Sequence, residues 1–365
     1  MSAAAKPFFV AVTPDAVGGR WGITRGDADV TAVYERFSAT LGEALGSADT
    51  PVQVTEEQWR NALERPGVFF DYLYPQSLSV LAGWLGTETA QTMGEQSARR
   101  LCLAAEKDAL ALYYLRAETG EFYRCGTALT AASIESRLGE YVPNGAKFLW
   151  ELTEEDTLDA YTLLEDTLPT LPRLTGTNPL RDGAAYEQLP ELFGFSGAAR
   201  SYTEAEGIVY VENDMTLRIL NSGTVIYRGG DEGLKLGGPE ALRTVVEAAR
   251  VLCQRGPGAC CGSAGLSLSA LEYDRQKDVC SLRFDYAVDG IPVRMTEGNA
   301  VEMTVAGGRL TEATLLFRSY TPEEETVTPL PRMLALAAVR AVGGGEPLLA
   351  YTDNHKEIEL QWLAQ

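Results

Sequence analysis

The stretch RLCLAAEKDALALYYLRAETGEFYRCGT, Arg100–Thr127, decides the fold class of this chain. It contains three apolar, strand-like runs, at 100–105, 109–116 and 120–127. Two polar breaks separate the runs, Glu106-Lys-Asp108 and Glu118-Thr-Gly120, and both suit tight turns. The stretch therefore predicts a meander of three antiparallel strands, and the pattern of Ala131 to Leu138 predicts a helix packed on it.

The residues before and after this meander extend the same N-terminal part. Apolar residues recur at helical spacing from Asp29 to Leu45. A second helix opens at Thr55-Glu-Glu-Gln-Trp59, where Thr55 is the expected N-cap and Gln58 completes a capping box, and it ends at Pro66. A short helix or turn is predicted at 77–85, and strands are predicted at 8–12, 68–73 and 148–152.

A second meander follows, and its turns are well marked. Asn213-Asp214 and Asn221-Ser-Gly223 are residues that tolerate positive φ, as hairpin turns require. Leu189 to Phe195 leads into this meander, and Gly238-Pro239 opens a helix that runs through Cys253, with proline at a permitted first-turn position. The strands are predicted at 199–203, 207–212, 216–220 and 224–227.

The last part of the chain repeats the pattern, with strands first and one helix after them. Strands are predicted at 267–273, 279–288, 291–294, 299–305 and 308–320. A helix at 330–342 and two strands, at 348–352 and 358–363, finish the chain. Strands followed by one helix thus occur three times, a loose architectural repeat. Because the helices are segregated from runs of strands, the fold class is α+β, with antiparallel sheets in meanders and helices packed on each.

The length of 365 residues suggests two to three domains. The segment Asp156–Asp182 is rich in proline and contains Thr175-Gly-Thr-Asn178, so it indicates a linker or crossover. We expect an N-terminal α+β domain at 1–155, a linker at 156–188, a middle β-meander and helix at 189–262, and a C-terminal curved sheet and helix at 263–365.

The formal net charge of −20 repels phosphate backbones and anionic headgroups, which argues against nucleic acid and direct lipid binding. No apolar stretch approaches the ~20 residues of a membrane span. Met1–Lys6 has no apolar region typical of a signal peptide. Two interpretations are open at this point: the protein is cytoplasmic, or an anchor lies outside this sequence.

The sequence contains no recognisable catalytic site. A nucleophile–histidine pair would need His355, the one histidine, which lies in a polar segment typical of an exposed turn. The glycine-rich segments 194–197, 229–238 and 256–262 match neither a phosphate loop, a dinucleotide fingerprint nor a nucleophile elbow. Two carboxylates could still form a hydrolase site, but nothing distinguishes a pair among the fifty-one acids. We expect no catalytic, cofactor-binding or metal-binding residue and no cofactor.

Six cysteines occur without a C-x-x-C motif, so a zinc site is poorly supported. Cys102 and Cys125 fall in strand-like runs and could pair if those strands are neighbours. The simpler interpretation is that the cysteines are small buried thiols. Vicinal Cys260 and Cys261 suit a loop better than a redox centre.

Several stretches resemble the YycH and YycI proteins of Gram-positive bacteria, in a divergent clostridial-type form. They touch most of the chain and are Trp59-Arg-Asn-Ala-Leu63, Pro66-Gly-Val-Phe-Phe-Asp-Tyr72, Leu81-Ala-Gly-Trp-Leu85, Leu192-Phe-Gly-Phe-Ser196, Gly207-Ile-Val-Tyr-Val211, Leu217-Arg-Ile219, Phe284-Asp-Tyr-Ala-Val-Asp-Gly-Ile-Pro292, Val301-Glu-Met-Thr-Val305, Arg318-Ser-Tyr320 and a distal strand with Trp362.

The resemblance implies a non-catalytic, extracytoplasmic regulatory protein, tethered by an N-terminal transmembrane anchor that is absent from this chain. It implies contact with a sensor histidine kinase ectodomain, or with a paralogous regulator, and no catalytic residues to carry over. A sheet edge or helix face would dock on the partner and shift the kinase between two states. Trp21 and Tyr320 are possible contact points, although ordinary packing explains both.

Two alternatives remain open. A small-molecule or peptide-binding module would show a deep apolar pocket with a few convergent polar groups. A carboxylate-dependent glycoside hydrolase would show two acids in one cleft with opposed environments.

Overall fold

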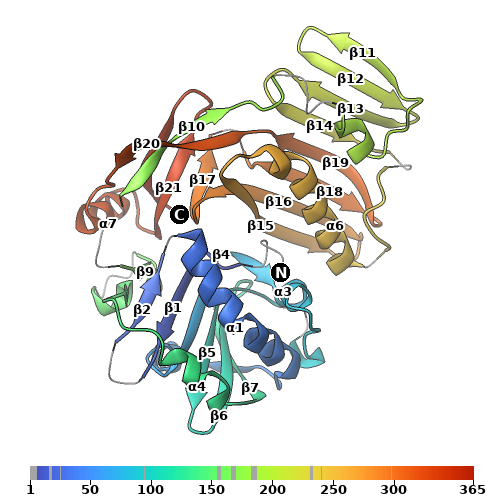
Figure 1. Cartoon of the computed structure of the whole chain (residues 1–365). Coiled ribbons are helices and arrows are strands. Elements are labelled where there is room, and N and C mark those ends of the chain that lie inside the picture. The colour runs from blue at the N-terminus through green and yellow to red at the C-terminus, as the bar shows by residue number, and fades with distance from the viewer. Residues whose placement is uncertain are drawn as a thin grey trace.

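A computed structural model describes residues 6–15, 19–24, 26–93, 95–153, 158–165, 170–181, 187–230, 233–239, 241–296 and 298–365. The chain forms two packed parts, an N-terminal one and a larger C-terminal one (Figure 1). Each is built mainly from antiparallel strands with segregated helices, with a parallel pair between 293–295 and 351–353 in the C-terminal part, so the predicted α+β class is confirmed.

The N-terminal part is a seven-stranded sheet in the order β2-β1-β4-β5-β6-β7-β3. The predicted meander forms its centre as β5, β6 and β7. The strands are β1 (Phe9–Thr13), β2 (Trp21–Ile23), β3 (Val52–Val54), β4 (Gly67–Ser77), β5 (Ser97–Glu106), β6 (Ala109–Arg116) and β7 (Phe122–Thr130).

Alternate residues of this sheet enter two different cores, as the period-2 geometry of a strand requires. Leu101 and Leu103 pack under α1 (Asp27–Ser47), α3 (Leu78–Trp84) and α4 (Ala132–Leu138). Cys102 and Ala104 point to the opposite face, where α2 (Glu56–Leu63) packs. The predicted cap of α2 is confirmed, because Thr55 and Gln58 form a reciprocal capping box.

The C-terminal part is an eleven-stranded sheet in the order β11-β12-β13-β14-β19-β18-β16-β17-β21-β22, with β15 paired to β16. α6 (Leu242–Arg255) packs on this sheet. The core between them contains residues of the second and the third predicted meander. The strands are β11 (Arg200–Glu204), β12 (Gly207–Glu212), β13 (Met215–Leu220), β14 (Thr224–Arg228), β15 (Ala264–Asp274), β16 (Val279–Val288), β17 (Ile291–Met295), β18 (Val301–Ala306), β19 (Arg309–Leu316), β21 (Pro347–Asp353) and β22 (Ile358–Ala364).

The remaining elements connect or cover these sheets. β10 (Leu171–Thr177) pairs with β20 (Ser319–Val327), and β8 (Lys147–Phe148) pairs with β9 (Leu163–Leu164). The other helices are α5 (Leu189–Leu192), α7 (Arg332–Ala341) and the 3₁₀ turns Gln91–Met93, Leu149–Glu151 and Pro257–Cys260.

The domain division remains a prediction. Hydrogen bonds between β14 and β19 cross the expected boundary between 262 and 263, so the second and third meanders share one sheet. The expected linker supplies β9 and β10. Some of its residues, 156–157, 166–169 and 182–186, lie outside the described ranges.

Three local predictions are wrong. Residues 148–152 are mostly a 3₁₀ turn, because the Phe148 N–H bonds to the Glu151 carboxylate at 2.5 Å. The strand expected at 308–320 is two strands, because the chain changes pairing partners after β19 and β20 pairs with β10. The helix expected from Gly238-Pro239 begins only at Leu242.

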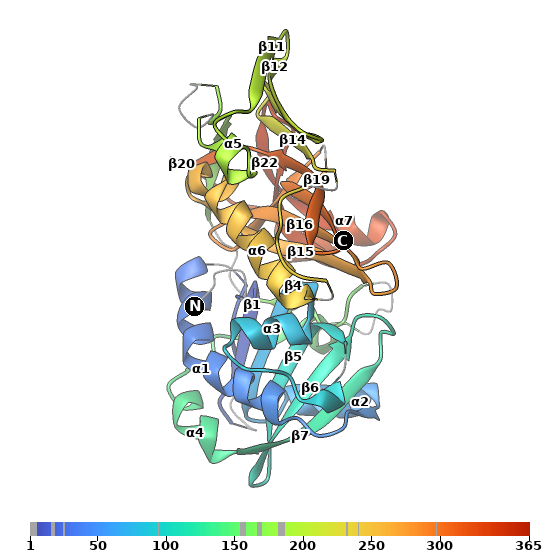
Figure 2. The same ribbon diagram turned by 90° about the vertical axis from the view of Figure 1, so that its right-hand side faces the viewer.

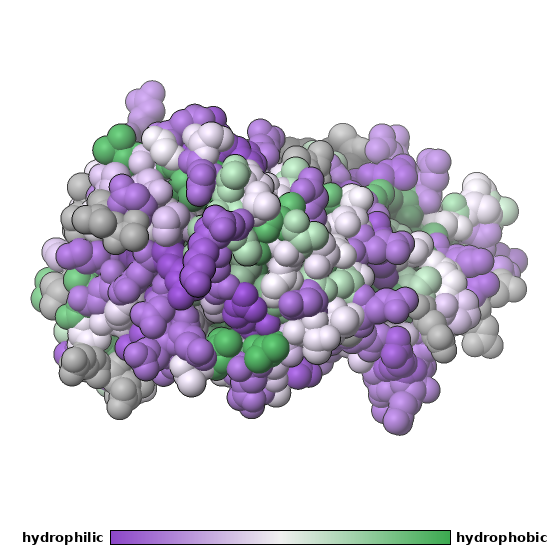
Figure 3. Space-filling model, turned by 90° about the horizontal axis from the view of Figure 1, so that it is seen from below, coloured by the Kyte–Doolittle hydropathy of each residue, from purple (hydrophilic) through white to green (hydrophobic). Residues whose placement is uncertain are grey.

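The two parts meet where β4 lies beside β15 and α3 lies against α6 (Figures 1 and 2). The indole N–H of Trp84 donates to Glu247 at 3.0 Å across this boundary. The face seen in Figure 3 is mainly hydrophilic with scattered apolar residues, in keeping with the net charge of −20. No helix of the described residues is long and apolar enough to cross a membrane.

Candidate functional site

A cavity of about 480 Å³ lies between the two parts, and we call it the junction cavity. Lys6, Pro7, Phe8 and Val30 line it from the N-terminal part. The C-terminal part supplies 263–267 of β15 and its approach, 287–290 at the end of β16, and two prolines, Pro172 and Pro322. Its volume falls in the range of small-molecule sites, and its lining is mostly apolar.

Local chain geometry explains how these segments meet. The backbone N–H of Phe8 donates to the Asp71 carbonyl at 2.8 Å and fixes the start of the chain against β4. The predicted Asp289-Gly290 turn is confirmed, with φ of 49° and 77°, as a tight turn of this type requires. The Asp289 carbonyl accepts from the Gly26 N–H at 3.1 Å, which joins this turn to the N-terminal part.

The centre of β4 departs from regular strand geometry beside this cavity. Leu73 is buried and has a φ of 64°, a left-handed conformation that is costly for leucine. Its N–H donates to the Asp71 carboxylate at 2.8 Å, and the pairing with β5 is irregular between Asp71 and Gln76. The bulge turns Tyr74 toward Phe8, with ring centroids 6.2 Å apart.

A first polar cluster joins Tyr74 to the C-terminal sheet. Its hydroxyl donates to Asp285 at 3.1 Å, and Arg294 bonds to the same hydroxyl. Asp285 also accepts from Arg294 at 3.2 Å and from Asn299 at 2.8 Å. Burial, and then the Asp285 charge, raise the pKa of Tyr74 above its ordinary value, so the phenol stays protonated and keeps its role as a donor.

A second cluster, the arginine clasp, is formed by Asp71, Arg99, Arg100, Asp159 and Glu346. Arg99 and Arg100 bond to the two oxygens of Asp71 at 2.8 and 2.9 Å. Arg99 reaches Glu346, just before β21, at 2.6 Å, and Arg100 reaches Asp159 at 2.7 Å. The clasp therefore links β4 and β5 to the C-terminal strands.

Burial and charge act differently on the carboxyls of the clasp. Burial alone would raise the pKa of Asp71, but Arg99 and Arg100 hold it below the ordinary value. At Glu346 burial outweighs Arg99 and raises the pKa. The three carboxylates Asp71, Asp159 and Glu346 exceed the two guanidinium groups by one charge, which favours a proton on Glu346.

Neither polar cluster was predicted from the sequence, although the sequence contains a signal for buried ion pairs. Asp71 interrupts an otherwise apolar strand run, and Arg99–Arg100 places two adjacent charges in a strand with buried neighbours. Buried charges are paired, so such residues indicate partners elsewhere in the chain. The sequence could not say that Glu346 is the partner.

The residues considered from the sequence lie mostly in structural positions. His355 lies in the turn between β21 and β22 with a φ of 69°, as predicted for a turn residue, and it is half-buried. Tyr320 is fully buried and donates to Asp353 at 2.9 Å, so it is not a contact point. Trp21 packs on Tyr141, with ring centroids 5.0 Å apart.

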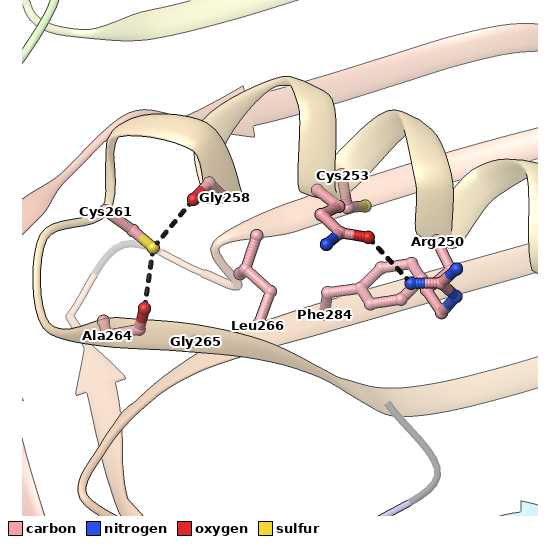
Figure 4. A pocket seen from close by; sticks show the side chains of 9 residues that line it. Arg250, Cys253, Gly258, Cys261, Ala264, Gly265, Leu266 and Phe284 are labelled. Carbon is pink, nitrogen blue, oxygen red and sulfur yellow. Dashed lines mark hydrogen bonds between the residues drawn. The ribbon is translucent and has the colours of Figure 1, made fainter. Parts of the chain in front are cut away.

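The cysteines are free thiols. Cys102 and Cys125 lie on β5 and β7, with β6 between them, and enter cores on opposite faces of the sheet. The Cys261 thiol donates to the Ala264 carbonyl at 2.7 Å, beside a small pocket (Figure 4). Burial raises the pKa of Cys260 to about 11, which leaves little reactive thiolate at neutral pH.

Two acids share one shallow hollow of about 210 Å³ on the sheet, Glu302 of β18 and Glu312 of β19. Both side chains are exposed, so their environments are alike rather than opposed. Within the described ranges, no group of three His, Cys, Asp or Glu residues could hold a metal ion.

These observations define the structural class of the protein. It is an α+β protein of meander sheets, with a cavity and buried ion pairs between its N-terminal and C-terminal parts. No family model matches the sequence. No curated protein matches it either. Among solved structures, the chain is similar to the crystal structure of YycH from Bacillus subtilis, with a TM-score of 0.66 and 10% sequence identity. The match covers 100% of this chain and 95% of that chain.

This likeness establishes a YycH-like fold. It does not extend to YycI or to the clostridial type that the sequence suggested.

Proposed function

We propose that the chain is a non-catalytic, extracytoplasmic regulatory protein of a Gram-positive bacterium, which modulates a membrane sensor histidine kinase by protein–protein contact. The observation that carries this proposal is the likeness to YycH over the whole chain, together with the sequence resemblance to the same proteins. A paralogous regulator is the second possible partner. An anchor outside this sequence would tether the protein.

The surface with the best features for such contact is the outer edge of the eleven-stranded sheet. β11 is an edge strand, and four of its five residues are exposed. Tyr202 is 51% exposed at its centre. Strand edges recruit partner strands, and tyrosine is enriched at interfaces. Figure 1 shows β11 at the far end of the molecule from the N-terminal part, where a partner can approach it.

The test is co-purification of the chain with a sensor histidine kinase from its host, combined with autophosphorylation of the reconstituted kinase with and without the chain. Tyr202→Ala should weaken retention and remove the effect on phosphorylation. Val142→Ala, at a side chain 78% exposed in the N-terminal part, is the matched control. A kinase that neither binds the chain nor changes its phosphorylation in its presence contradicts the proposal.

One observation favours the alternative of a binding module. The junction cavity has the apolar lining and the volume that a small-molecule or peptide site needs, which supports that alternative. No comparable feature favours a glycoside hydrolase, since Glu302 and Glu312 are both exposed.

A further inference from the structure

We propose that β11 pairs edge to edge with the β11 of a second copy of this chain, antiparallel and centred on Tyr202, so that two eleven-stranded sheets become one. This inference goes beyond the proposed function, because it concerns the chain alone and holds whether or not a kinase binds. It rests on an unprotected edge strand, on the register of its outward backbone groups, and on side chains that complement their own copy.

β11 lacks the features that usually protect a sheet edge. Native proteins keep edge strands short, cover them, or place proline, lysine or a β-bulge in them. Among the described residues, β11 pairs with β12 alone, its register with β12 is unbroken, and its sequence Arg-Ser-Tyr-Thr-Glu has neither proline nor lysine. By contrast, the edge strands β2 and β3 have three residues each, and β22 lies beside α7 and β10. β11 therefore offers five residues to another strand.

Hairpin geometry decides which backbone groups of β11 face outward. Two residues join β11 to β12, and a hairpin of this length closes on a hydrogen-bonded pair, here Glu204 and Gly207. Hydrogen-bonded pairs alternate along an antiparallel ladder. The N–H and carbonyl groups of Ser201 and Thr203 therefore point away from β12, toward the open edge.

One register satisfies these outward groups. When two antiparallel copies of β11 meet with Tyr202 opposite Tyr202, Ser201 of each copy lies opposite Thr203 of the other. Both residues present outward groups, so each such pair exchanges two backbone hydrogen bonds, and the two-fold axis repeats the exchange. All residues of β11 are paired in this register, whereas a register shifted in either direction leaves part of each strand unpaired.

The same register places complementary side chains opposite each other. Arg200 begins the strand and Glu204 ends it, so each arginine faces the glutamate of the other copy. Opposite charges in opposed positions stabilise a strand pair, and like charges destabilise it. Glu204 keeps its bond to Arg218 at 2.8 Å and gains a second cation. Tyr202, 51% exposed in the single chain, meets its own copy at the centre, where an aromatic pair is favourable.

The position of β11 limits the charge repulsion between two copies. A net charge of −20 on each chain opposes self-association. Figures 1 and 2 show β11 at the extreme end of the molecule, so edge-to-edge pairing places the two N-terminal parts at opposite ends of the dimer. At ~0.15 M salt, exposed charges more than about 8 Å apart are largely screened. A strand edge accepts one partner at a time, so self-pairing and kinase contact through β11 exclude each other.

Sedimentation equilibrium of the purified chain tests the proposal directly. The interface is small and belongs to the class of transient complexes. We therefore expect a monomer–dimer equilibrium over roughly 5–500 µM protein at ~0.15 M salt. A chain that stays monomeric over this range overturns the proposal.

Charge reversal tests whether the edge of β11 forms the dimer. Arg200→Glu places glutamate opposite Glu204 at both ends of the strand pair and should weaken the dimer at least about fivefold. The matched control is Arg283→Glu, which changes the net charge equally and breaks an exposed ion pair to Glu272 inside the sheet. This control should dimerise like the wild type. Equal weakening in both variants would assign the effect to net charge and overturn the pairing.

Mixing two variants tests the register. Glu204→Arg alone places arginine opposite Arg200 and should also weaken self-pairing. A mixture of Arg200→Glu and Glu204→Arg chains restores opposite charges at both ends, so the heterodimer should form about as tightly as the wild-type dimer. A mixture that associates no more than its separate components overturns the register.

A proline variant tests the backbone pairing. Thr203→Pro removes an N–H that faces outward and leaves the bonds to β12 in place, so it should keep the wild-type thermal melt and lose the dimer. A wild-type dimer in this variant contradicts strand pairing. If the variant fails to fold, the mixture decides. Kinase co-purification can fail without affecting any of these results, and a monomeric chain leaves the kinase proposal standing.

Discussion

Arg100→Ala should be among the most destabilising single substitutions in this protein. Arg100 is 2% exposed and bonds to Asp71 at 2.9 Å, to Asp159 at 2.7 Å and to Glu346 at 3.3 Å. Its removal leaves Asp71 and Glu346 with Arg99 alone and takes the guanidinium partner from Asp159. Removing one partner from a buried ion pair costs about 3–5 kcal/mol, because the remaining charge is buried without compensation.

The expected shift of the melting temperature follows from the chain length. At about 2.1 cal/mol/K per residue, unfolding of 365 residues carries an entropy of roughly 0.77 kcal/mol/K. A loss of 3–5 kcal/mol therefore lowers the melting temperature by about 4–7 °C if the chain unfolds as one unit.

Differential scanning calorimetry and urea unfolding provide the assay. The control is Arg218→Ala, which removes an exposed ion pair to Glu204, with side chains 44% and 38% exposed. Such surface pairs contribute about 0–1 kcal/mol, so this variant should melt within about 1–2 °C of the wild type. Equal shifts for Arg100→Ala and Arg218→Ala would refute the argument that the arginine clasp joins the two parts.

Three further predictions concern acid stability, thiol reactivity and helix capping. Burial alone would raise the pKa of Glu106, but hydrogen bonds from Arg124 and Tyr113 lower it from 4.5 to about 2. The ionised Glu106 carboxylate therefore contributes fully to folding stability above pH 4.5, and this contribution is lost as the pH falls toward 2. In urea unfolding, the difference in free energy of unfolding between the wild type and Glu106→Gln should shrink over that pH range. A difference that stays constant contradicts this prediction. Iodoacetamide at pH 8 should modify half-buried Cys260 before Cys102, because Cys102 is buried and burial raises its pKa to about 12. Mass spectrometry follows the two alkylation rates. Equal rates for the two cysteines would show that the N-terminal core is open. Thr55→Ala should lower the free energy of unfolding by about 1 kcal/mol, because the α2 capping box is lost. Thr314→Ala, at an exposed strand position, is the control and should lower it by less. Equal losses in urea unfolding would exclude the cap as the cause.

Much of the local structure could be predicted from the sequence, because its signals are local. The meander of Arg100–Thr127 was recognisable from apolar runs and polar breaks, and it forms the centre of the N-terminal sheet. The α2 cap at Thr55 and the hairpin turn at Asp289-Gly290 depend on residues within a few positions of one another. Two of the three errors fall at 148–152 and 308–320, where a side-chain bond or a change of strand partner decides the outcome, and the third is the start of α6, which lies at Leu242.

The candidate site could be predicted only in part. Asp71 within an apolar run and the doublet Arg99–Arg100 signal buried ion pairs, but they do not name the partner. The possible pairing of Cys102 with Cys125 failed for a related reason. Strand-like runs do not say which strands are neighbours or which face a residue enters.

The sequence by itself determined the α+β class, the succession of meanders and the absence of a recognisable catalytic motif, because periodicity, turn chemistry and residue types are properties of short segments. Only the tertiary structure decided that the second and third meanders share a sheet and that Glu346 meets Arg99 across 247 positions. It also decided that Lys6–Phe8 and β15 enclose one cavity. These features arise from contacts between distant segments, which packing of the whole chain selects and which no local pattern records.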